Sequence, residues 1–214
     1  MRKAVTGMNM KISRGAGLLA MGVAILGAIE IWRGGWSWDE VLKQSLPWLI
    51  IATAAMIHEL GHVVAAVCLG VGIRGMKLDL FGARLELGGM LSYGGECWIA
   101  VGGPLANFLS VALLCPIPLF QETGGGALFL GASLTLGCVN LLPLWTLDGG
   151  RILRSAVAWV AGDRVADRLL QWTTGMCLGL LWLLAVYALL RKGQMLSLFA
   201  FSLCLLLRTV KREP

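Results

Sequence analysis

Apolar residues fill the chain in long runs, and short polar segments separate those runs. A helix needs about 20 residues to cross the hydrocarbon core of a bilayer. Six runs approach that length, at about 15–32, 47–71, 97–119, 126–147, 170–190 and 194–208. The pattern predicts an all-α polytopic membrane protein with about six transmembrane helices.

One segment between the second and third runs has a different period. In K-L-D-L-F-G-A-R-L-E-L, residues 77–87, polar and apolar positions alternate, which is typical of β-strands. A two-residue turn at Phe81-Gly82 would create three cross-strand pairs: Asp79 with Arg84, Lys77 with Glu86, and Leu78 with Leu85. We therefore predict a small β-hairpin at about 77–87, with an irregular loop as the alternative.

Composition and charge agree with a membrane protein. The chain is 57% hydrophobic and 14% charged, whereas soluble domains carry about 25% charged residues. With the N-terminus in the cytoplasm, most basic residues fall in segments on the cytoplasmic side, as the positive-inside rule requires. This distribution explains the net charge of +6 without a nucleic-acid partner. We expect a multi-pass protein of the cell membrane with both termini in the cytoplasm.

The two histidines of the chain lie together in H-E-L-G-H, His58 to His62. Four residues make about one helical turn, so both imidazoles face the same side and can reach one Zn²⁺ at about 2.0–2.1 Å. Glu59 can reach a water molecule on the same metal. A charged group near the centre of a bilayer costs at least about 2.5–3.5 kcal/mol, which favours metal ligation over ordinary packing or interhelical hydrogen bonding.

A catalytic zinc site usually has three protein ligands, so a carboxylate or a thiolate has to complete the pair of histidines. Asp148 ends the segment N-L-L-P-L-W-T-L-D-G-G, residues 140–150, in which Pro143 interrupts the helix. Apolar character resumes at Ile152, so residues 126–161 can form one long broken crossing that carries Asp148 toward the second run. The alternative is that Asp148 is an ordinary N-cap of the following helix.

These motifs, together with V-G-G-P-L-A-N at residues 101–107, resemble the site-2 protease family of intramembrane zinc metalloproteases. The resemblance covers about 47–161 and is greatest to the branch of the stage IV sporulation factor protease. That branch often carries a CBS domain. We expect a single membrane-embedded peptidase domain over residues 1–214, with no PDZ or CBS domain.

The resemblance implies roles for individual residues. It implies one zinc ion per chain held by His58, His62 and Asp148, with Glu59 as the catalytic acid and base. It also implies substrate contacts, which we assign to Asn140, Pro143, Gly103 and Asn107. The hairpin resembles a membrane-associated element of the family that pairs with an extended substrate.

The resemblance predicts a peptidase that hydrolyses membrane-tethered proteins within or near their transmembrane segment. Its expected partners are that substrate, the lipid bilayer of a bacterial inner membrane, and a regulatory membrane protein or a second copy of the chain. Two alternatives would also bind a metal ion. One is a metal-ion transporter, although no internal repeat is visible. The other is a different membrane zinc hydrolase, such as a prenyl-protein peptidase.

Overall fold

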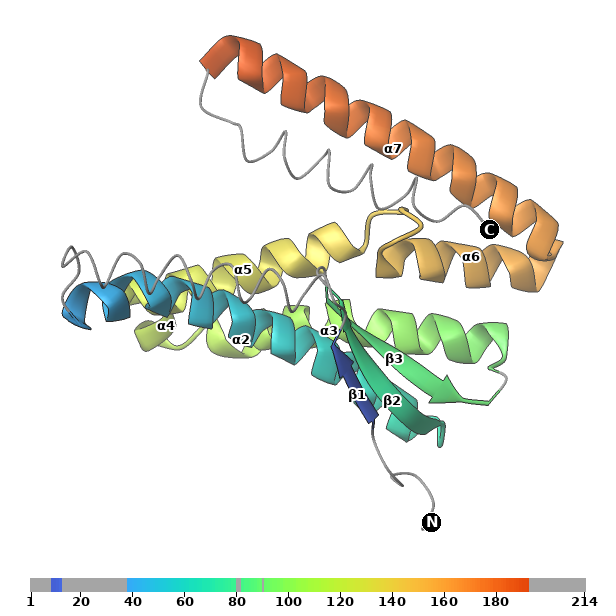
Figure 1. The fold of residues 1–214 in the computed structure, drawn as a ribbon, viewed down its shortest axis with the longest axis horizontal. Helices are drawn as coiled ribbons and strands as arrows, with labels where there is room; N and C mark the ends of the chain where they lie inside the picture. The colour runs from blue at the N-terminus through green and yellow to red at the C-terminus, as the bar shows by residue number, and fades with distance from the viewer. Residues whose placement is uncertain (1–8, 13–37, 80–81, 90, 193–214) are drawn as a thin grey trace. The chain divides into compact units, whose positions relative to one another are not determined.

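The computed structural model describes residues 9–12, 38–79, 82–89 and 91–192, and they are mostly helical (Figure 1). The helices are α2 (Trp38–Cys68), α3 (Tyr93–Leu114), α4 (Pro118–Glu122), α5 (Gly124–Asn140), α6 (Asp148–Ala161) and α7 (Asp163–Lys192). The strands are β1 (Asn9–Ile12), β2 (Gly72–Asp79) and β3 (Gly82–Gly88).

Three of the described helices are long and apolar enough to cross a membrane. They contain Asp39–Cys68 of α2, Tyr93–Leu114 of α3 and Asp163–Tyr187 of α7, and they correspond to the second, third and fifth predicted crossings. The first and sixth predicted crossings lie outside the described residues. The large apolar side chains of these three helices are mostly exposed, as expected where lipid rather than protein surrounds a helix.

The fourth predicted crossing is shorter than expected. It was predicted to extend over 126–147, but α5 has 17 residues and ends at Asn140. Pro143 lacks an N–H group and cannot continue the hydrogen-bond ladder of the helix. The chain forms turns up to Leu147 and then begins α6, so this part of the sequence is broken as the alternative interpretation of 126–161 expected.

The predicted hairpin is present but longer, and its register differs from the prediction. Strand β2 pairs antiparallel with β3 from Gly72↔Gly88 to Asp79↔Gly82, which leaves residues 80 and 81 between the strands. Lys77 therefore pairs with Arg84, and the three predicted cross-strand pairs are wrong. They assumed a turn one residue later along the chain, which moves every pairing by two positions.

A third strand joins the hairpin from the N-terminal segment. Strand β1 runs parallel to β2, with Asn9 opposite Gly75 and Ile12 opposite Leu78. The sheet order is β1-β2-β3, so β2 lies in the centre and both of its edges are occupied over this stretch (Figure 1). Helix α2 contacts both β2 and β3.

The described chain forms two compact units. The first contains the sheet, α2, α4, residues 102–114 of α3 and residues 124–137 of α5. The second contains α6, α7, residues 93–101 of α3 and the end of α5 with the turns that follow it. Each unit holds a different part of the predicted metal site.

Candidate metal centre

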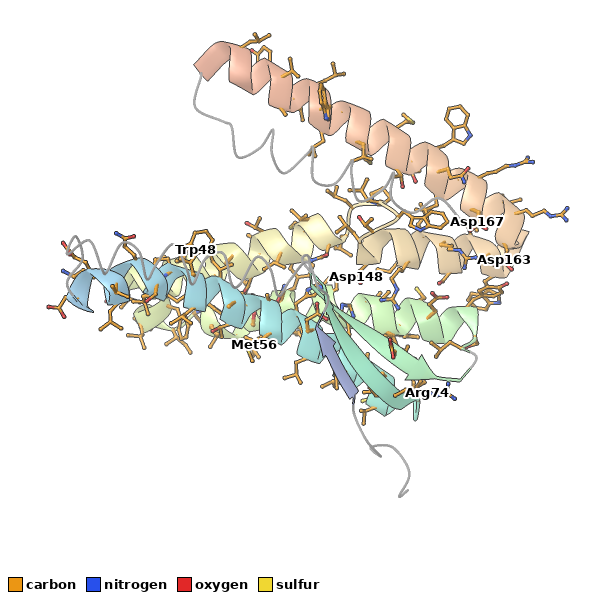
Figure 2. All side chains as sticks on the ribbon, viewed as in Figure 1. Trp48, Met56, Arg74, Asp148, Asp163 and Asp167 are labelled. Atoms are coloured by element: carbon orange, nitrogen blue, oxygen red, sulfur yellow. The ribbon has the colours of Figure 1, made fainter. Side chains whose placement is uncertain are left out.

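The first unit positions the two histidines on the buried face of α2. Buried residues recur every four positions along this helix, at Ala54, His58, His62 and Ala66. The other face carries exposed apolar side chains, among them Met56 (Figure 2), Leu60, Val64 and Val67. The polar imidazoles thus lie in the interior while apolar groups face outward, which is the reverse of a soluble helix. The ring centroids are 4.9 Å apart and the planes are nearly perpendicular, at 87°.

Helix α3 approaches this face through a contact between two glycine backbones. A Cβ atom on Gly61 would overlap the carbonyl oxygen of Gly102, and one on Gly102 would lie 2.6 Å from the carbonyl oxygen of Gly61. Only glycine allows the two backbones to come this close. The glycine of the H-E-L-G-H motif therefore sets the distance between the histidine helix and α3.

This close approach brings two predicted substrate residues, Gly103 and Asn107, against the histidines. The Gly103 amide N–H donates a 3.3 Å hydrogen bond to Nδ1 of His62. The Asn107 carboxamide nitrogen lies 3.2 Å from Nδ1 of His58. Asn107 is completely buried, and its Oδ1 has no hydrogen-bond partner among the described residues. Glu59 follows His58 on α2 and is half-buried.

The second unit contains the other predicted site residues, Asn140, Pro143 and Asp148. Asp148 is the first residue of α6 and is buried, with 9% of its surface exposed. The N-cap position belongs to Leu147, so the interpretation of Asp148 as an ordinary N-cap is wrong. The Asp148 carboxylate lies 3.6 Å from the guanidinium of Arg151, one turn further along the helix. Asn140 and Pro143 are half-buried.

The two glycines after Asp148 fix the path of the chain before it. A Cβ atom on Gly149 would overlap the carbonyl of Leu141, and one on Gly150 would overlap the carbonyl of Leu144. The turns of residues 141–147 therefore fold back onto the first turn of α6, where only glycine leaves room. Leu144 also packs on Leu178 of α7.

The corner between α6 and α7 carries an ion-pair cluster that sequence reasoning did not predict. Arg154 donates hydrogen bonds to Asp167 at 2.8 Å and to Asp163 at 3.2 Å, and the Tyr93 hydroxyl donates to Asp163 at 2.8 Å (both acids are labelled in Figure 2). Desolvation lowers the pKa of Arg154, but the hydrogen bond and charge of Asp167 outweigh it and the pKa is raised. Exposed ion pairs stabilise a fold by about 0.2–1 kcal/mol each. The cluster therefore makes a modest contribution to the stability of the corner between α6 and α7.

The chain is similar to one class of known proteins in sequence and in fold. Residues 126–184, which span α5 to most of α7, match the model of peptidase family M50. The fold matches the site-2 protease of Methanocaldococcus jannaschii, with a TM-score of 0.61 over 92% of this chain and 88% of that one. The sequence identity in that match is 20%. The predicted resemblance to the site-2 protease family is confirmed.

Two of the similar proteins are metalloprotease and sporulation proteins of known organisms. A zinc metalloprotease of M. jannaschii is 30% identical over 133 residues, which is 56% of this chain and 38% of that protein. Stage IV sporulation protein FB of Bacillus subtilis is 30% identical over 159 residues, which is 71% of this chain and 54% of that protein. The chain thus spans about half, or less, of the length of these relatives.

Proposed function

We propose that the chain is an intramembrane zinc metalloprotease that cuts membrane-tethered proteins within or near their transmembrane segment. The observation that carries this proposal is the position of His58 and His62, which are buried on one face of an otherwise apolar membrane-type helix. The peptidase family match, the names of the relatives and the shared fold support it.

We assign one zinc ion to His58, His62 and Asp148. All three side chains are buried. Among the described residues, they form the group of metal-binding side chains that could hold one ion. Two imidazole nitrogens and one carboxylate are a typical ligand set for catalytic zinc, which keeps one position open. A zinc ion in this set would acidify a water molecule and polarise the substrate carbonyl.

The protein groups perform the proton transfers. Glu59 takes a proton from the attacking water as the water oxygen bonds to the carbonyl carbon. As the C–N bond breaks, Glu59 returns that proton to the leaving amine nitrogen, so atoms and charges balance. We assign to Asn140, at the start of the motif that contains Asp148, a hydrogen bond to the developing oxyanion.

A Glu59→Gln variant tests the activity directly. It removes the proton acceptor and leaves the three ligands in place, so we expect unchanged zinc content and a loss of cleavage of at least about 100-fold. The measurement is metal analysis of the purified protein together with cleavage of a tethered substrate in vesicles. Cleavage at the wild-type rate would overturn the peptidase assignment. Zinc flux that survives the substitution would favour the transporter instead.

The edge of β3, which has no strand partner other than β2 among the described residues, is the proposed docking site for the substrate. Either half of the hairpin sequence, residues 77–81 or 84–90, is a candidate for pairing with an extended substrate. Because β1 pairs with β2 from Gly75 to Leu78, the edge of β3 is the better candidate within the hairpin. A helical substrate hides its carbonyl groups in its own hydrogen bonds, and pairing with β3 would replace those bonds as the substrate unwinds.

The proposed setting is a multi-pass arrangement in the cell membrane, with the hairpin associated with the membrane and both termini in the cytoplasm. The apolar exposed helices and the distribution of basic residues support it. A regulatory membrane protein or a second copy is a further proposed partner. The G-x-x-x-G pair Gly175 and Gly179 on α7 supports this, since a Cβ atom at either position would meet nothing within 4 Å.

A further inference from the structure

Two residues that the resemblance assigned to the substrate lie against the histidines. Gly103 and Asn107 lie one turn apart on α3, and both are buried. A Cβ atom built on Gly103 would overlap Nε2 of His62 and lie 2.7 Å from Nε2 of His58. The Asn107 carboxamide meets the opposite nitrogen, Nδ1, of His58. The two α3 residues thus contact different edges of the same imidazole.

We propose that Gly103 and Asn107 are positioning residues of the metal centre: Gly103 keeps the space between the two imidazoles clear, and Asn107 sets the tautomer of His58. This inference rests on the proposed function, because it assumes that His58 and His62 ligate zinc. If Gly103 and Asn107 position the ligands, they affect the affinity for zinc. If they contact the substrate, they affect the affinity for the peptide.

The role of Gly103 follows from the size of the coordination sphere. Zinc lies about 2.0–2.1 Å from a histidine nitrogen, so an ion held by both imidazoles has to occupy space close to both rings. A Cβ atom at residue 103 would lie within 2.7 Å of both Nε2 atoms and would take up that same space. The backbone contact between Gly61 and Gly102 holds α3 too close for the helix to move away. Any side chain at position 103 therefore competes with the ion.

The role of Asn107 follows from the tautomers of neutral imidazole. A ring that ligates metal through Nε2 carries its proton on Nδ1, and a fixed acceptor at Nδ1 selects that tautomer. The carboxamide can bond in either orientation, because Nδ2 donates to a bare Nδ1 and, after a half turn, Oδ1 accepts from a protonated one. When Oδ1 of Asn107 accepts from a protonated Nδ1, the lone pair of Nε2 of His58 is available to a metal ion. The other orientation places the ring proton on Nε2.

Gly103→Ala tests the first role, with Gly131→Ala as its control. Gly131 is also a helical glycine, but a Cβ atom there would meet nothing within 4 Å. We expect Gly103→Ala to weaken zinc binding of the full chain in detergent by at least about 100-fold, measured by competition with a chelator. The melting temperature of its zinc-free form should stay close to that of Gly131→Ala, since the added methyl meets only the ends of two side chains.

Asn107→Leu and Asn107→Asp test the second role. Leu removes the acceptor at Nδ1 and should weaken zinc binding about 10- to 100-fold, whereas Asp keeps an acceptor and should restore most of the affinity. If the Gly103→Ala and Asn107→Leu proteins bind zinc within twofold of wild type and only the KM for a tethered substrate rises, both residues are substrate contacts and the inference is wrong. A wild-type protein that binds no zinc would instead overturn the proposed function itself.

Discussion

Four glycines of this chain serve as contact surfaces rather than as flexible points. Gly61 and Gly102 bring two helix backbones together, and Gly149 and Gly150 accept the carbonyl groups of the turns before α6. None of these four has a positive φ, so the absence of a side chain, not backbone freedom, explains them. Each glycine lies within three residues of a proposed zinc ligand or of Gly103.

Gly61→Ala should destabilise the first unit. The new methyl group would overlap the backbone carbonyl of Gly102, which cannot move aside as a side chain can. Overpacking of this kind costs about 1–3 kcal/mol, so the melting temperature of the zinc-free protein should fall relative to Gly131→Ala. Equal melting temperatures for the two variants in detergent would show that the helices separate without strain.

At this scale, sequence reasoning reached the residues whose chemistry is unusual for their surroundings. His58 and His62 were identifiable because polar groups interrupt an apolar run, and Asp148 because an acid follows a broken one. The contact between Asn107 and His58 could not be predicted, because the residue of α3 that faces a given histidine depends on where the two helices cross. That crossing depends on Gly61 and Gly102, whose partners no local pattern reveals.

At the scale of elements, periodicity predicted the hairpin and apolar length predicted the three long helices. The register failed because it depends on which two residues form the turn, and favourable charge pairs were a poor guide to that choice. Strand β1 was missed altogether, since its four residues are too few to show a period and its partner lies more than 60 positions away. Long-range pairing is the part of a sheet that local sequence specifies least.

Proline substitutions in β3 test the docking edge. Backbone N–H groups alternate between the two sides of a strand. Leu85→Pro and Glu86→Pro therefore form a matched pair: one removes an N–H group that faces β2, and the other removes an N–H group on the outer edge of β3. The substitution on the β2 side should destabilise the hairpin. The other should lower cleavage of a helical substrate by at least about tenfold with zinc content unchanged, because one donor for the substrate is lost. Unaltered cleavage in both variants would exclude strand pairing.

At the scale of the whole molecule, the two units divide the proposed ligands, with both histidines in the first and the aspartate in the second. The fold likeness extends over 92% of the chain, which is more than the 47–161 that the motifs cover. The likeness therefore extends beyond the segment that carries the motifs. The six crossings and the single domain remain predictions.

The orientation in the membrane is open to a direct measurement. If both termini are cytoplasmic, green fluorescent protein fused after Pro214 should fluoresce, and alkaline phosphatase at the same place should be inactive. The expectation rests on the basic residues, since lysine and arginine are retained on the cytoplasmic side. Fusions between the first predicted crossing and α2 serve as the opposite control. An active phosphatase at the C-terminus would reverse the assigned orientation.

The turns that precede Asp148 depend on a helix that carries no motif. Leu144 packs on Leu178, and the backbone N–H of Trp145 donates a 3.1 Å hydrogen bond to Thr174 Oγ1 in α7. A fragment trimmed to residues 47–161 would keep every recognisable signature and lose the support beneath its aspartate. The shortest fragment expected to hold Asp148 in place therefore extends past Leu178, beyond the last residue of the motifs.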